Sequence, residues 1–332
     1  MKKSLYTILA IIFAFAFILN SCKKNKNETP STTSTTTTTT ACTPKTTFTP
    51  DTASGPRLIF KFKFDSTQVR LNNLGQPSTF AVGNAAQSPI FNSISQHYIE
   101  LAGDFDSVGK GKVLYVGKQT TAGGDNAIDY CSSIITGQDA IFYSTSLKSI
   151  TPGSYKWLRV SLAYQNANIT YIANEIPGNH IGTGTIASFI GFNTYITGYS
   201  LNGTTYTPSA TAGGQGNHKQ GYWAFETTIV GTKYFKDGQA PAGATTVVNP
   251  LFATSPIPAG SCLVTGQFVD NTKAYSPLVI TGNETQDIII TVSLSTNKSF
   301  EWVDKIADGY FQPEEGENLV DMGVRGMIPT KN

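Results

Sequence analysis

Two short acidic clusters contain residue types that can hold a metal ion. The first contains Asp104 and Asp106, and the second contains Asp125 and Asp129. Carboxylate oxygens in flexible loops are the ligands that Ca²⁺ prefers. However, neither cluster has the spacing of an EF-hand loop, and Asp is also common in turns, where its side chain bonds to nearby backbone. The sequence favours ordinary turns and leaves Ca²⁺ as the candidate cofactor.

A second candidate metal site consists of His97 and Glu100. Two side chains at this spacing share a face in a helix, where they can ligate a transition metal together, but they point to opposite faces in a strand. The other histidines, His180 and His218, lie far away in the sequence, and none of the three is in an HxH or HExxH pattern. The sequence favours a strand histidine with a hydrogen-bonded partner.

Aromatic residues suggest sugar binding as a further kind of chemistry. The candidate stacking residues are Trp157, Trp223 and Trp302, in a chain that also has 15 tyrosines. An exposed aromatic ring offers an apolar face with a polar edge, which suits a sugar ring. Trp157 and Trp223 lie within strand patterns, so core packing is the favoured alternative for both.

Signals for catalysis are weak throughout the chain. There is no GxSxG nucleophile motif, and the Gly182-Thr183-Gly184 segment lacks the strand–turn–helix context of a nucleotide site. We find no pair of carboxylates placed as in a glycosidase. The sequence therefore names no catalytic residue and favours a non-enzymatic role. An envelope hydrolase stays as an alternative, because catalytic sites can assemble from distant loops.

Cysteines other than Cys22 occur at positions 42, 131 and 262. In an exported protein these thiols can form disulfides. Cys131 and Cys262 both adjoin strand candidates, so they are the expected pair, closing a loop of about 130 residues worth about 4–5 kcal/mol. Two buried free thiols are the alternative. Cys42 is expected to be exposed, either free or linked to one of the others.

The N-terminal segment has the pattern of a secretory signal. Lys2 and Lys3 precede an apolar run over residues 5–19, which is shorter than the roughly 20 residues of a membrane span. The following Leu19-Asn20-Ser21-Cys22 resembles the lipobox of bacterial lipoproteins. This resemblance implies that residues 1–21 are removed and that Cys22 carries diacylglycerol and an amide-linked acyl chain such as palmitate. Two or three chains are needed for stable anchoring in a membrane.

Residues 22–54 have the composition of a flexible tether. They contain a threonine tract and almost no apolar side chains, so burial cannot offset the entropy of ordering them. About 33 flexible residues span roughly 30 Å. Within this segment, Asp51-Thr52-Ala53 resembles the O-glycosylation site of Bacteroidota, which makes Thr52 a candidate for modification.

The remaining residues, 55–332, show the alternation of β-strands. In residues 57–64 the apolar side chains Leu58, Phe60, Phe62 and Phe64 fall on one face, and residues 156–164 and 287–294 alternate in the same way. One short helix is expected at residues 300–307. Many short strands separated by glycine-containing turns predict an all-β fold, an antiparallel β-sandwich built as one large or two small sandwiches.

The chain resembles an uncharacterised envelope lipoprotein of Bacteroidota, because it combines a lipobox, a threonine-rich tether and a β-rich body. The resemblance implies a lipid anchor in the outer membrane. Basic residues stand after Cys22, where surface-exposed lipoproteins of this phylum carry acidic ones, so both the periplasmic and the outer face stay open. The net charge of +2 gives no support to nucleic-acid binding. We expect a lipid-anchored envelope protein with a non-enzymatic binding or structural role; its ligand is not identified by the sequence, and a glycan or another envelope protein is the candidate partner. The alternatives are a carbohydrate-binding module of a glycan-uptake or adhesion system and an envelope protein that binds calcium or a transition metal.

Overall fold

The computed structural model describes residues 42–332 except 73–75, 104–107, 175–177, 241–255 and 259. Strands make up 53% of the chain, and no helix in the described part reaches seven residues, which confirms the all-β prediction. The helical elements among the described residues are four short 3₁₀ turns, η1(Tyr130–Ser132), η2(Leu147–Ser149), η3(Ala210–Ala212) and η5(Pro313–Glu315).

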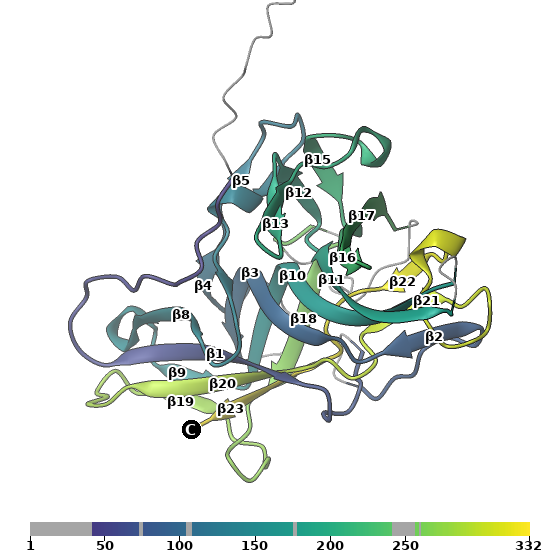
Figure 1. The fold of residues 1–332 in the computed structure, drawn as a ribbon. Coiled ribbons are helices and arrows are strands. Elements are labelled where there is room, and N and C mark those ends of the chain that lie inside the picture. Colours follow the sequence, from purple (N-terminus) through teal and green to yellow (C-terminus); the bar gives the residue numbers. More distant parts are fainter. Residues whose placement is uncertain (1–41, 73–75, 104–107, 175–177, 241–255, 259) are drawn as a thin grey trace, which may run out of the picture. The chain divides into compact units, whose positions relative to one another are not determined.

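Two large sheets form the main sandwich (Figure 1). The four-stranded sheet has the order β23(Met327–Lys331), β20(Ile288–Ser295), β1(Arg57–Asp65) and β8(Ile141–Ser146). The eight-stranded sheet curls into half a barrel. Its strands, in order, are β17(Thr232–Gln239), β16(Tyr222–Ile229), β11(His180–Phe189), β10(Trp157–Ala173), β3(Ile90–Ala102) and β4(Lys112–Val116), with β18(Cys262–Gln267) paired to β10 and β7(Ile135–Thr136) paired to β3.

Smaller sheets cover the rest of the body. One has four strands, β15(Gly216–Lys219), β12(Asn193–Ile196), β6(Ala127–Asp129) and β5(Gln119–Thr120), and another has three, β2(Asn84–Gln87), β21(Phe300–Val303) and β22(Leu319–Asp321). Two-stranded pairs are formed by β13(Tyr199–Leu201) with β14(Thr204–Tyr206) and by β19(Leu278–Ile280) with β9(Gly153–Tyr155).

The alternation seen in the sequence decides which faces are buried. In β1, Leu58, Phe60 and Phe62 point inward and are fully buried, while Lys61 and Lys63 point outward. They pack in one core with residues of the curled sheet and of β20; this core includes Ile99, Leu101, Leu158, Val160, Leu162, Val264, Ile290, Val292 and Leu294. Aromatic residues on the opposite face of the curled sheet form a second core under β12, β13 and β14, which includes Tyr130, Tyr164, Phe189, Tyr199 and Tyr222.

The helix expected at residues 300–307 is wrong. Residues Phe300–Val303 form strand β21, which pairs with β2 on one side and β22 on the other. Phe300 and Trp302 are buried in the main core, whereas Ile306 is 44% exposed. Two neighbouring strands supply partners for the backbone here, and such tertiary pairing overrides a weak local helical pattern.

Residues 42–54 are bound to the body in several places. Cys42 forms a disulfide with Cys131, and the backbone of Lys45 bridges to Ile134. The ring of Phe48 packs on that of Tyr143, with 5.4 Å between the ring centroids. Contacts with the body therefore begin before residue 54, where the end of the tether was expected. Nothing in the described part is a helix long and apolar enough to cross a bilayer.

Candidate functional site

A surface cavity of about 690 Å³ lies where β18, at the edge of the curled sheet, meets the outer face of β1, β20 and β23. We call this cavity the trough. Its wall combines polar side chains with one aromatic ring and several aliphatic side chains. Its lining residues include Lys63, Asp65, Thr67, Gln68, Trp157, Gly266, Gln267, Val269, Asn271, Lys273, Thr291, Ser293, Thr330 and Asn332.

The position of Trp157 follows from strand pairing. It begins β10 and lies opposite Gln267 of β18, so both side chains are on the same face of the pair. Trp157 is partly buried and lines the trough. The neighbouring Gly266, opposite Leu158, allows β23 to come close, because a Cβ there would lie 2.5 Å from the carbonyl oxygen of Met327. This glycine closes the corner between the two sheets.

One wall of the trough is the turn that follows β18. The Asp270 carboxylate accepts hydrogen bonds from the backbone and hydroxyl of Thr272 and from the backbone of Ala274, which fixes the turn. Lys273 has a positive φ of 69°, and its ammonium donates to Thr330 Oγ1 on β23 at 3.0 Å. Tyr275 is 51% exposed at the end of the same turn, where it bridges to Val269.

The facing wall is the segment that follows β1. Asp65 Oδ1 accepts hydrogen bonds from the Thr67 backbone (2.9 Å) and hydroxyl (2.6 Å), and Oδ2 accepts one from Lys63 Nζ (3.0 Å). The hydrogen bonds from Thr67 and Lys63 lower the pKa of Asp65 to about 2. Gln68 Oε1 accepts from the Ser293 hydroxyl at 2.8 Å. Gln68 Nε2 is buried and has no hydrogen-bond partner in the described part of the chain.

The His97–Glu100 pair does not form a joint metal site. His97 is the extra residue of a β-bulge in β3, and its Nε2 lies 2.9 Å from Gln119 Nε2. Burial lowers the pKa of His97 to about 4. Glu100 is fully buried elsewhere, paired with Arg159 at 3.7 Å. It also accepts hydrogen bonds from the backbone of Gly109 and Gly111. Both residues therefore have structural partners.

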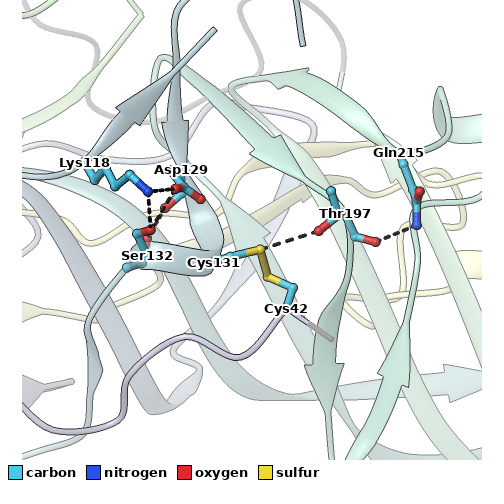
Figure 2. The surroundings of a disulfide bond; sticks show 8 residues. Cys42, Lys118, Asp129, Cys131, Ser132, Thr197 and Gln215 are labelled. Atoms are coloured by element: carbon cyan, nitrogen blue, oxygen red, sulfur yellow. Dashed lines mark hydrogen bonds and ion pairs between the residues drawn. A yellow bond between two sulfur atoms is a disulfide. The ribbon is translucent and has the colours of Figure 1, made fainter. Parts of the chain in front are cut away.

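The two candidate calcium ligands that are described, Asp125 and Asp129, have protein partners of their own. Asp129 is bonded to the hydroxyl of Ser132 at 2.7 Å and to Lys118 at 3.1 Å (Figure 2). The carbonyl of Asp125 accepts a hydrogen bond from the Asn217 side chain. Asp104 and Asp106 lie outside the described residues. Within the described part, no group of three or more His, Cys, Asp or Glu side chains is arranged to hold a metal ion.

Two of the three tryptophans are core residues. Trp302 is 1% exposed and Trp223 is 8% exposed, both within the main core, so neither ring is available for stacking on a sugar. Trp157 is the candidate that reaches an accessible cavity. The alternation in the sequence predicts that Trp157 lies on a strand. The side chains that surround it come from four segments that are distant in the sequence, so no local pattern predicts that they meet.

The expected Cys131–Cys262 disulfide is wrong. Cys131 is bonded to Cys42, and its sulfur lies 3.5 Å from Thr197 Oγ1 of the segment after β12 (Figure 2). Cys262 is a free thiol, fully buried in the main core, and burial raises its pKa to about 12. Cys262 begins β18 opposite Leu162, whereas Cys131 lies in η1 under the second core, so the two are on different elements.

The remaining candidates lie at or before the start of the body. Thr52 is exposed, and the carboxylate of the preceding Asp51 is paired with Arg57 at 2.9 Å. Cys22 lies outside the described residues. The chain matches no protein-family model, no curated protein and no solved structure in the comparisons made.

Proposed function

We propose that this protein is a lipid-anchored envelope protein that binds a glycan in the trough without acting on it chemically. The observation that carries the proposal is the composition of the trough, where the partly buried ring of Trp157 shares a cavity of about 690 Å³ with hydroxyl and amide side chains. A sugar ring has an apolar face for the indole and hydroxyl groups for the polar wall.

The rim also supports a glycan ligand. Tyr275, which is half-exposed, pairs through its backbone with Val269 of the lining, so the turn beside the trough carries a second aromatic residue. Asp65 is the one carboxylate side chain among the lining residues, and it is occupied by Thr67 and Lys63. Glycoside hydrolysis ordinarily requires two carboxylates across the scissile bond. The trough is therefore suited to binding.

The location of the trough agrees with attachment through an N-terminal tether. The body meets the preceding chain at Cys42, which is bonded to Cys131 beside β6, while the trough lies by β23 at the opposite end of the body (Figure 1). An anchor on Cys22 would then leave the trough accessible. Mass spectrometry of the native N-terminus tests this part of the proposal, because an unmodified Cys22 thiol would rule out the lipid anchor.

Glycan binding is tested with the full mature chain on an array of envelope, plant and host glycans, followed by calorimetry on the best ligand. We expect Trp157→Ala to weaken binding about tenfold, because the stacking surface is lost. The matched control is Tyr310→Ala, which removes an exposed ring that does not line the trough. Unchanged affinity in Trp157→Ala, with the fold intact by circular dichroism, would refute the trough as the site.

A further inference from the structure

A buried carboxylate lies at the margin of the second core, far from the trough in the sequence. Glu226 of β16 is 2% exposed, and the β13–β14 hairpin packs on the same face of the curled sheet. The Tyr206 hydroxyl donates to Oε2 of this carboxylate, and the Tyr206 ring stacks on Phe235, with 4.1 Å between the ring centroids. The carboxylate is therefore held in place and largely screened from water.

The other oxygen of Glu226 contacts two different nitrogen groups. Asn202 Nδ2 donates to Oε1 at 3.4 Å, and the Lys233 ammonium lies 3.9 Å from the same Oε1. This ammonium also donates to Thr204 Oγ1, which keeps it at the hairpin that carries Asn202. An ion pair between a glutamate and a half-exposed lysine is common in proteins and by itself indicates no chemistry. Here the same oxygen also contacts a primary amide, so an amine, a proton carrier and an acyl group meet at one point.

From this arrangement we propose that Lys233 and Asn202 become joined by an isopeptide bond, with Glu226 transferring the proton. The bond links β17 to the turn between β13 and β14, and this modification is independent of the glycan binding proposed above. A lysine amine is a nucleophile once an adjacent base has taken its proton. Because the fold already holds the amine and the amide beside one carboxylate, the reaction requires no bimolecular encounter.

The reaction is a transamidation that needs no co-reactant. The Glu226 carboxylate takes one proton from the Lys233 ammonium, and the resulting amine attacks Cγ of Asn202 to form the new C–N bond. Glu226 then passes its proton to Nδ2, and the bond between Cγ and Nδ2 breaks. Ammonia leaves and carries a second proton of the lysine nitrogen away as ammonium.

A hydroxyl is placed to assist this step. Thr185 Oγ1 lies 3.0 Å from Oδ1 of both Asn202 and Asn168, so it can donate to the charge that develops on the Asn202 oxygen during the attack. The Asn202 amide therefore has a donor at its oxygen and the Glu226 carboxylate at its nitrogen, which are the two atoms whose charge changes in the reaction.

Peptide mass spectrometry of the full mature chain tests the proposal. Chymotrypsin cleaves after aromatic and large aliphatic residues, so it separates residues 202–206 from residues 226–234 in an unlinked chain. We expect the digest of the reduced wild-type protein to contain one species that joins these two peptides and is lighter than their sum by one ammonia molecule. If the wild-type digest contained the two peptides only in their separate, full-mass forms, the proposal would be overturned.

Three variants separate the cross-link from another loss of ammonia. Asn202 precedes Gly203, whose backbone nitrogen could close a succinimide on Asn202 with the same loss but with no second peptide attached. Lys233→Met should remove both the linked species and the ammonia loss, and Glu226→Gln should leave the two peptides unlinked although Lys233 and Asn202 remain. Lys219→Met is the control, since it removes an exposed lysine of β15 and should keep the link.

The variants also define what would contradict the proposal. Loss of ammonia at Asn202 that persists in Lys233→Met would identify a succinimide and overturn the cross-link. A link that forms as completely in Glu226→Gln as in the wild-type protein would overturn the role of Glu226. Circular dichroism verifies that each variant is folded, and the wild-type digest decides the proposal even if a variant does not fold.

Discussion

The two ends of the body place their polar side chains in different surroundings. At the disulfide end, formed by β5, β6, β12 and β15 with Cys42 and Cys131, the Asp129 carboxylate is bonded to Ser132 and Lys118. At the trough end, Asp65 is bonded to Thr67 and Lys63 in the same way, but this pair lines a cavity that Trp157 also reaches. Paired carboxylates can thus be structural at both ends, and the aromatic ring in a cavity with polar side chains makes the trough the better candidate for recognition.

The largest expected effect is loss of the disulfide at the first of these ends. Cys131→Ser opens a loop whose ends are 89 residues apart, and should lower the free energy of unfolding by about 4 kcal/mol. Urea denaturation measures this change. A reducing agent should bring the wild-type protein to the same stability and leave the variant unaffected, with glycan binding of the folded protein unchanged. If reduction left the stability of the wild-type protein unchanged, the prediction that the disulfide stabilises this end would be wrong.

A somewhat smaller effect concerns pH and His97, which contacts Gln119 of β5. Burial holds the pKa of His97 at about 4, below the ordinary 6.5, so the folded protein disfavours the charged ring. The unfolded chain takes up the proton first as the pH falls. The neutral ring therefore makes its whole contribution to stability above pH 6.5. The free energy of unfolding decreases by about 3 kcal/mol between pH 6.5 and 4.

Urea midpoints at pH 7, 5 and 4 measure this loss. His97→Gln should show a shallower decrease with falling pH than the wild-type protein, and the control His180→Gln should keep the wild-type slope. If His97→Gln lost stability with the same slope as the wild-type protein, protonation of His97 would not be the cause.

The smallest effect is expected at the trough itself. Lys63→Gln breaks an ion pair with Asp65 in which the lysine side chain is 48% exposed. Exposed pairs of this kind contribute less than about 1 kcal/mol, so the unfolding free energy should hardly change. A loss above about 2 kcal/mol by urea denaturation would mean that the trough end is as tightly coupled to stability as the disulfide end.

Strand alternation made the fold predictable, whereas the site depends on contacts that no local pattern contains. Leu58, Phe60 and Phe62 indicated a strand with one buried face, and that is what β1 shows. The helix expected at residues 300–307 was wrong, because Trp302 is buried between two strands that the sequence does not reveal as its neighbours.

The disulfide and the trough were hidden for the same physical reason. Cys42 follows a threonine-rich stretch, and nothing near it indicates that Lys45 and Phe48 bind the body. Likewise, Gln68 and Lys273 come from turns separated by most of the chain and meet through the pairing of β18 with β10 and the approach of β23 at Gly266. The spacing of residues along the sequence does not indicate which distant segments come into contact.

The pairing of β1 has a consequence for how the protein is made. β1 lies between β8 and β20, and it runs parallel to β20, with Leu58 opposite Ile288. The first long strand of the body therefore cannot complete its sheet until nearly the whole chain has been synthesised. Contacts this distant make folding slow and leave Phe60 and Phe62 exposed in the meantime. Folding should be a late event of the whole chain, during which the nascent protein depends on chaperones to avoid aggregation.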